Sequence, residues 1–139
     1  MVMKNIFLAV SLLVGCIGVA NAEIDGKRQF IALVDGEVPA NVMREYNAAQ
    51  SSLHNLRNKY INEADQLVKV SDYQKAYTLS CVQLPQVINN LVDNDTALLK
   101  HLRYQSSIRQ VKNTIATNKK VLSAMDLDCK KIQAAIQDQ

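Results

Sequence analysis

Three cysteines, two histidines and a close pair of aspartates are the side chains of this 139-residue sequence that could take part in chemistry. Thiols form disulfides or bind metals, imidazoles bind metals or move protons, and paired carboxylates act as acid and base. No second metal ligand stands three or four residues from His54 or His101, so neither histidine predicts a metal site. We place His54 on the outer face of a helix and interpret His101 as a core or boundary residue. Asp126 and Asp128 precede an apolar-periodic stretch and are typical of helix caps.

The motifs that identify common enzyme classes do not occur in the sequence. It has no nucleophile elbow, no glycine-rich phosphate-binding loop and no Cys-x-x-Cys pair. The formal net charge is only +3. We therefore expect a protein that is not an enzyme, with no catalytic residue, no cofactor, no metal and no nucleic-acid partner.

Residues 1–22 have the build of an export signal. Lys4 supplies a positive charge, an apolar run extends from Ile6 to Ala20, and Ala20-Asn21-Ala22 fits the small-x-small rule for cleavage. The run is about 15 residues long, shorter than the roughly 20 that a membrane-spanning helix needs. The sequence therefore predicts cleavage before Glu23 and a periplasmic or secreted protein.

The sequence around Cys16 suggests an alternative location for the protein. Leu13-Val14-Gly15-Cys16 resembles a bacterial lipobox, which would make Cys16 the lipidated first residue of a protein anchored in the outer membrane. The apolar run, however, continues beyond Cys16 to Ala20, where an anchored protein usually begins a polar tether. We therefore favour cleavage at Ala22, and expect contact with a membrane only if Cys16 is lipidated.

Cys81 and Cys129 are the two cysteines that remain after either cleavage. An exported protein enters an oxidising compartment, where an even number of cysteines indicates disulfide pairing. We predict a Cys81–Cys129 disulfide, which would constrain the unfolded chain by about 4 kcal/mol in the loop-entropy model. The alternative is a pair of buried free thiols that act as small apolar side chains.

Residues 23–38 differ in composition from the rest of the chain. Asp25-Gly26 and Asp35-Gly36 are turn signals on either side of Phe30–Val34, a short β-compatible apolar run. A single strand cannot satisfy its own backbone hydrogen bonds, so we expect an extended arm that lies against helices. An alternative is that the arm adds to the sheet edge of a partner.

Helical periodicity begins at Pro39. The apolar spacing from Val42 to Leu67 predicts a first helix of about 30 residues, with Pro39 in its first turn. Ser71 and Asp72 are good N-cap residues for a second helix that runs back along the first. We expect Pro85 to kink or break this helix beside Cys81, because proline lacks the N–H that would bond the Cys81 carbonyl. Residues 93–96 then predict a turn.

A third helical stripe runs from Ala97 to Ile136. As one helix it would span about 40 residues and roughly 60 Å, which is long for a domain of this size. With a turn near residue 94, Cys81 would face about position 108, too far from Cys129 for a disulfide. We therefore expect the helix to reverse near Thr117-Asn118. An unbroken helix would instead suggest a coiled-coil stripe through which the chain associates with itself.

Charge is unevenly distributed along this third stripe. Residues 96–125 contain several bases and no acid, so we expect a basic helix surface. The candidate partner-binding residues lie within about a third of the circumference of one helix: Arg109, Lys112, Lys119 and Lys120. The alternative is a solvated face that is offset by acids on neighbouring helices, such as Glu45, Glu63 and Asp65.

Together these patterns predict an all-α fold: an antiparallel helical hairpin or a three- to four-helix bundle with an extended N-terminal arm. The domains would be a signal peptide (1–22), the arm (23–38) and a helical domain (39–139). We expect a non-enzymatic protein that binds another envelope or secreted protein. Alternatives are an outer-membrane lipoprotein that assists a secretion or envelope assembly, and a periplasmic inhibitor or immunity protein against a toxic enzyme.

Overall fold

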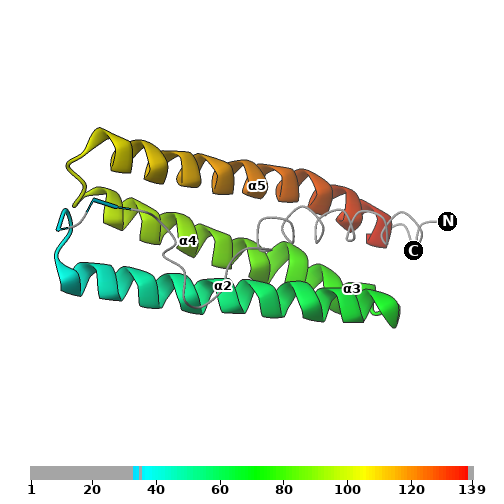
Figure 1. Ribbon diagram of the computed structural model, residues 1–139. Helices are drawn as coiled ribbons and strands as arrows, with labels where there is room; N and C mark the ends of the chain where they lie inside the picture. Colours follow the sequence, from blue (N-terminus) through cyan, green and yellow to red (C-terminus); the bar gives the residue numbers. More distant parts are fainter. Residues whose placement is uncertain (1–32, 35, 138–139) are drawn as a thin grey trace.

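The structure of the protein, a computed structural model, describes residues 33–34 and 36–137, and these contain helices and no strand (Figure 1). The all-α class is therefore confirmed for this part of the chain. The predicted signal peptide, the predicted lipidation site at Cys16 and most of the predicted arm at 23–38 lie outside the described residues. The helical elements, in chain order, are α2 (Ala40–Lys69), α3 (Tyr73–Tyr77), the π-helical turn η1 (Thr78–Gln83), α4 (Leu84–Leu99) and α5 (Gln105–Gln137).

Three antiparallel helical segments lie side by side in this structure. The first is α2, the second is the continuous run α3–η1–α4, and the third is α5 (Figure 1). Helix α4 is the middle element, since α2 and α5 both pack against it, whereas the backbones of α2 and α5 make no close approach to each other. The core therefore depends on side chains that converge from both sides onto α4.

Helix α2 begins and ends where the local sequence signals predict. Pro39 is its N-cap residue, and its C-terminus is closed by two backbone bonds, from Ser71 N–H to the Val68 carbonyl and from Asp72 N–H to the Leu67 carbonyl. This pattern is a Schellman motif, which usually places glycine where Ser71 has φ 62°. Asp72 then caps α3 by accepting a hydrogen bond from Lys75 N–H.

Pro85 is accommodated by the π-helical turn that contains Cys81. The N–H of Leu84 donates to the carbonyl of Leu79, five residues earlier, instead of the usual four. Such turns arise where the regular hydrogen-bond ladder is interrupted, and a proline that lacks an N–H interrupts it here. The expected irregularity beside Cys81 is present as a π-helical turn, and the helix continues through it.

The predicted turn at residues 93–96 is wrong, because α4 continues through these residues to Leu99. Thr96 is compatible with a helix interior, since its hydroxyl donates to the Val92 carbonyl one turn earlier. The Asp95 carboxylate faces the core and accepts a hydrogen bond from Tyr46, so it does not cap a new helix. The chain reverses at residues 100–104 instead.

Helix α5 is unbroken from Gln105 to Gln137, so the reversal expected near Thr117-Asn118 does not occur. The stripe from Ala97 to Ile136 is likewise not one helix, because its first residues belong to α4 and to the turn. The turn lies about eight residues later in the sequence than predicted. Because the chain reverses there, the residue of α5 that faces Cys81 lies about twice that number of residues later, which brings it toward Cys129. The later turn therefore lets α5 remain straight while Cys81 and Cys129 approach each other.

The start of α5 is fixed by a buried carboxylate from outside the helix. Glu37 accepts hydrogen bonds from the backbone N–H groups of Arg103 and Tyr104, and from the hydroxyl of Ser107. Glu37 thus satisfies two backbone donors immediately before α5 and one hydroxyl in its first turn. Gly36, with φ 77°, provides the turn that brings Glu37 to this position.

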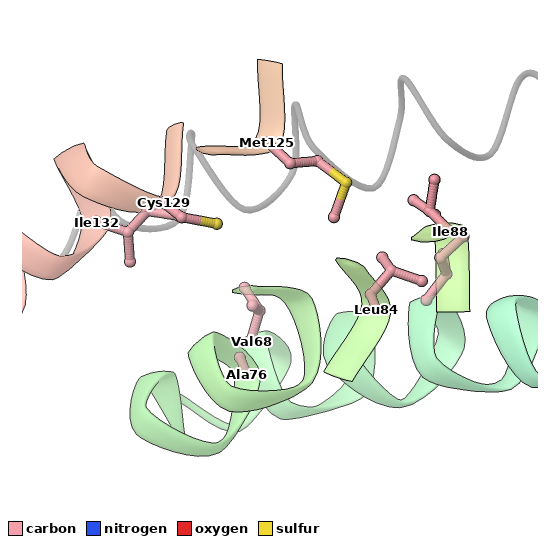
Figure 2. Close-up of a cluster of buried hydrophobic side chains, with 8 residues drawn as sticks. Val68, Ala76, Leu84, Ile88, Met125, Cys129 and Ile132 are labelled. Carbon is pink, nitrogen blue, oxygen red and sulfur yellow. The ribbon is translucent and has the colours of Figure 1, made fainter. Parts of the chain in front are cut away.

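The apolar core is divided into two clusters. One lies around the disulfide, where Figure 2 shows Met125, Cys129 and Ile132 of α5 opposite side chains of the other helices. The other cluster packs beside the α4–α5 turn. The buried members of the first are Ile61, Val68, Ala76, Leu84, Ile88, Met125, Cys129 and Ile132, and those of the second are Val38, Tyr46, Leu98, Leu102 and Val111.

The disulfide between Cys81 and Cys129 is present and joins the π-helical turn to α5, with 5.7 Å between the two Cα atoms. This confirms the predicted pair, although the fold-back that we invoked to form it is absent. Cys129 is buried among apolar side chains, and Cys81 packs beside it. Disulfides of this kind persist in oxidising compartments outside the cytosol.

Candidate interaction surface

The predicted basic residues lie together on the solvent face of α5. Arg109, Lys112, Lys119 and Lys120 are all exposed in the structure. At 100° per residue they occupy an arc of about 100° on the helix. The buried residues of α5 centre on the opposite side of the helix: Ser107, Val111, Met125, Cys129 and Ile132. We call the exposed arc the outer basic face.

None of these four cations forms a salt bridge with another described residue. The acids that could have offset them are engaged on their own helix, since Glu63 pairs with Lys59 and Asp65 pairs with Lys69. Glu45 is exposed on α2, whose backbone makes no close approach to α5. In the described part of the chain, the four cations of the face therefore have no ion-pair partner.

The outer basic face extends toward the C-terminal end of α5 beyond the four predicted residues. Leu127 lies on the same arc as Arg109 and is 60% exposed, which is unusual for a leucine. Lys131 is also exposed nearby, and Lys130 pairs with Asp126 at 3.1 Å. Sequence reasoning missed Leu127 because the neighbouring aspartates were interpreted as caps, whereas both lie within the helix. Projecting the sequence on a continuous helix would have found it.

Two attachments fix the orientation of this face. Near its N-terminus, α5 is held by Glu37, which is only 4% exposed. Burial tends to raise the pKa of this carboxyl, but its hydrogen bonds from Ser107, Tyr104 and Arg103 outweigh that effect and lower the pKa below its ordinary value. Toward its C-terminus, the disulfide holds Cys129. The helix is thus attached to the other elements at both ends.

A second unusual feature is a buried polar layer on α2, between the two apolar clusters. It consists of Gln50, His54 and Arg57, all buried. Burial, and secondarily the positive charge of Arg57, lower the pKa of His54 to about 4. Burial also lowers the pKa of Arg57 to about 10.

Both sequence-based placements of the histidines are therefore wrong. His54 is buried instead of lying on the outer face, because α2 turns Gln50, His54 and Arg57 inward and leaves Leu53 and Leu56 only half-buried. His101 is exposed, because it belongs to the turn after α4 and not to a helical stripe. Within the described residues, neither histidine belongs to a group of three or more potential metal ligands.

The polar contacts of α2 continue onto α4. The side-chain amide of Asn94 donates to the Tyr46 carbonyl and to Oε1 of Gln50, and the hydroxyl of Tyr46 donates to Asp95. Burial raises the pKa of Asp95, although the hydrogen bond from Tyr46 acts in the opposite direction. Burial and the adjacent Asp95 raise the pKa of Tyr46 well above its ordinary value. Sequence reasoning missed this network, because Asn94 and Asp95 looked like turn residues.

One shallow hollow of about 190 Å³ lies beside the disulfide end, where α3 meets the end of α5. Its lining combines amides with a phenol and an aliphatic side chain, and contains no charged group. Its one ionisable lining group is a phenol, which has no second group there to complete an acid–base pair. The lining residues are Gln74, Tyr77, Gln133, Ile136 and Gln137.

Within the residues that the structure describes, no helix is long and apolar enough to cross a membrane. Comparisons with known proteins find no matching family model, no similar curated protein and no similar solved structure. In the described part of the chain, the outer basic face is the surface that combines charge, exposure and fixed orientation.

Proposed function

We propose that this chain is an exported, non-enzymatic helical protein that binds another envelope or secreted protein through the outer basic face of α5. The observation that carries the proposal is the set of four exposed cations, Arg109, Lys112, Lys119 and Lys120, none of which has an acidic partner in the described structure. The exposed Leu127 adds an apolar contact on the same arc.

The partner that fits this face carries acidic side chains. Complementary charges guide two proteins toward the correct encounter and accelerate association more than they increase the final affinity. Exposed charges are screened over about 8 Å at physiological ionic strength, so such binding weakens with salt. A face whose orientation is held by Glu37 and by the disulfide presents these charges without a large ordering cost.

The location in this proposal is the periplasm or the cell exterior, and the signal peptide is cleaved before Glu23. The disulfide supports an oxidising compartment. The lipobox-like residues ending at Cys16 favour a second candidate, a lipoprotein of the outer membrane that uses the same face to assist an assembly there. Mass analysis of the mature N-terminus separates the two, since only the second begins at a lipid-modified Cys16.

The decisive experiment is capture of the partner by crosslinking in envelope fractions, followed by association kinetics. The test variant carries Arg109→Glu and Lys112→Glu. The matched control carries Arg44→Glu and Lys100→Glu, which reverse two other exposed cations that form no salt bridge within the described residues. We expect association to slow about tenfold or more in the test variant at low salt, with an unchanged circular dichroism spectrum. Equal capture by both variants would contradict the proposal.

A further inference from the structure

The shallow hollow where α3 meets the end of α5 combines an apolar inner surface with an edge of amides. Tyr77 and Ile136 are half-buried and pack against the apolar cluster around the disulfide. Gln74, Gln133 and Gln137 are exposed and complete the lining. Small-molecule sites in proteins commonly have this composition, in which apolar contacts supply affinity and a few polar groups fix the orientation of the ligand.

The disulfide holds the two walls of this hollow together. Tyr77 lies four residues before Cys81, and Gln133 lies four residues after Cys129, so each wall is about one helical turn from the bridge. The helices that carry these walls also share the buried cluster that contains Ala76 and Cys129 (Figure 2). A ligand that enters the hollow therefore meets walls that are already in place, which lowers the ordering cost of binding.

The chemistry of the lining favours a neutral ligand with hydroxyl groups. No charged side chain lines the hollow, so an ion that entered it would lose water without gaining a counter-charge. Each glutamine amide offers two N–H donors and a carbonyl acceptor, and hydroxyl groups both donate and accept. The volume of about 190 Å³ is below the roughly 300–1,000 Å³ of pockets for drug-sized molecules, so the hollow suits a single ring.

We propose that this hollow binds the terminal pyranose of a neutral glycan. In this arrangement a C–H face of the sugar ring lies against Tyr77 and Ile136, and its hydroxyl groups exchange hydrogen bonds with the amides of Gln74, Gln133 and Gln137. The exposed edge of the hollow leaves room for the rest of the glycan to extend into solvent.

The sugar site is separate from the outer basic face and goes beyond the protein binding proposed above. Around α5, Gln133 lies about 120° from the direction of Arg109, and Ile136 lies about 180° from it. No residue that lines the hollow is one of the four cations of that face. Variants of the two sites therefore test the two proposals independently.

Nuclear magnetic resonance of the isotope-labelled protein tests the site, because the side-chain amides of glutamine give their own signals. The probe is N-acetylglucosamine, a neutral pyranose. We expect saturable shifts of the amide signals of Gln74, Gln133 and Gln137, with a dissociation constant on the order of 1 mM for so small a ligand. The absence of saturable shifts at these residues up to about 100 mM sugar would overturn the proposal.

A matched pair of variants assigns the binding to the hollow. The test variant carries Gln74→Ala and Gln133→Ala, which remove two lining amides and keep a residue that favours helix. The control carries Gln66→Ala and Gln110→Ala, two exposed glutamines outside the lining. We expect the test variant to bind at least about fivefold more weakly with an unchanged circular dichroism spectrum, and the control to bind normally. Equal affinities of the two variants would overturn the proposal.

Two further ligands test the charge and the length of the glycan. Glucuronic acid should bind more weakly than glucose, its neutral counterpart, because no cation lines the hollow to compensate its carboxylate. Chitotriose, a short chain of N-acetylglucosamine, should bind at least as tightly as the single sugar, because only its terminal ring needs to enter. Tighter binding of glucuronic acid than of glucose, or loss of binding by the trisaccharide, would overturn the assignment to the end of a neutral glycan.

Discussion

The hydroxyl of Tyr46 donates a 2.6 Å hydrogen bond to Oδ1 of Asp95, and this contact joins α2 to α4 inside the core. Asp95 is fully buried at 0% exposure, and its other oxygen, Oδ2, has no hydrogen-bond partner among the described residues. Tyr46 is therefore the main compensation that this carboxylate has for its lost hydration. The pair also fixes the register of the two helices, because a shift of either would separate a buried donor from a buried acceptor.

Tyr46→Phe should destabilise the protein by about 2–3 kcal/mol, because it leaves a buried carboxylate without its hydrogen-bond donor. Urea unfolding at pH 7 measures the change. Tyr60→Phe is the matched control, since Tyr60 is half-buried and makes no side-chain hydrogen bond in the described structure, and it should change stability by less than about 0.5 kcal/mol. Similar losses in both variants would show that the Tyr46–Asp95 bond adds nothing specific.

Asp95→Asn should behave in the opposite way, because it removes the charge and keeps an oxygen that accepts from Tyr46. Burial raises the pKa of Asp95 in the folded protein, despite the opposing Tyr46 hydrogen bond. Its contribution to stability is therefore fully present below the pKa of the unfolded chain and is lost as pH rises through the folded pKa. We expect the gain of Asp95→Asn over the unchanged protein to grow between acid and neutral pH in urea titrations. A variant that is less stable at pH 7 would contradict this expectation.

The local part of the fold could be predicted from the sequence because its signals are local. Pro39 marks the start of the first helix, and Asp72 marks its end and the start of the next helix. Each acts through its own backbone or its immediate neighbours. The pairing of Cys81 with Cys129 could also be predicted, because only two cysteines follow the predicted export signal. The grouping of the four cations on one helix face could be predicted from the 100° step between successive residues of a helix.

The remaining features depend on contacts between residues that are distant in the sequence. The start of α5 depends on Glu37, which lies about 70 residues earlier in the sequence. Local signals, such as the turn residues at 93–96, therefore could not locate it. The inward face of α2 is likewise decided by α4, where Asn94 and Asp95 bind Gln50 and Tyr46. The apolar stripe alone predicted a face rotated toward Leu53 and Leu56, and so placed His54 outside.

The stability of the protein should depend on the protonation of His54. Burial and the adjacent Arg57 lower the pKa of this imidazole from an ordinary 6.5 to about 4. The unfolded chain therefore binds a proton that the folded protein does not, and stability falls as pH decreases from about 6.5 to about 4. The shift sets an upper limit of about 3 kcal/mol, which partial solvent screening reduces.

Thermal unfolding between pH 4 and pH 7 checks this dependence. His54→Gln should flatten the pH profile, because glutamine does not titrate. His101→Gln is the control, since His101 is exposed, and should leave the profile unchanged. The explanation fails if His54→Gln retains the full slope of the unchanged protein.

Glu37→Ala should loosen the start of α5 while the rest of the helix remains. The variant removes the acceptor for the backbone N–H groups of Arg103 and Tyr104, so these amides should exchange with solvent faster. The pKa of Glu37 is lowered in the folded protein, so its stabilisation is present above the pKa of the unfolded chain and is lost as pH falls through the folded value. Amide exchange by mass spectrometry resolves the effect, and the exposed Glu45→Ala should not reproduce it.

The last prediction concerns the disulfide that joins the π-helical turn to α5. Replacing both cysteines, with Cys81→Ser and Cys129→Ser, should lower stability by about 2–4 kcal/mol, because the unfolded chain loses a constraint on a long loop. The double variant avoids a lone thiol that could form dimers. Reduction of the unchanged protein should lower the urea midpoint by a similar amount and should have no effect on the double variant. On non-reducing gels the native protein should migrate as a monomer, and thiol-alkylating reagents should label neither Cys81 nor Cys129 until a reductant is added. A disulfide-linked dimer, or labelling of both cysteines in the native protein, would contradict the intramolecular bridge and with it the attachment of the C-terminal half of α5.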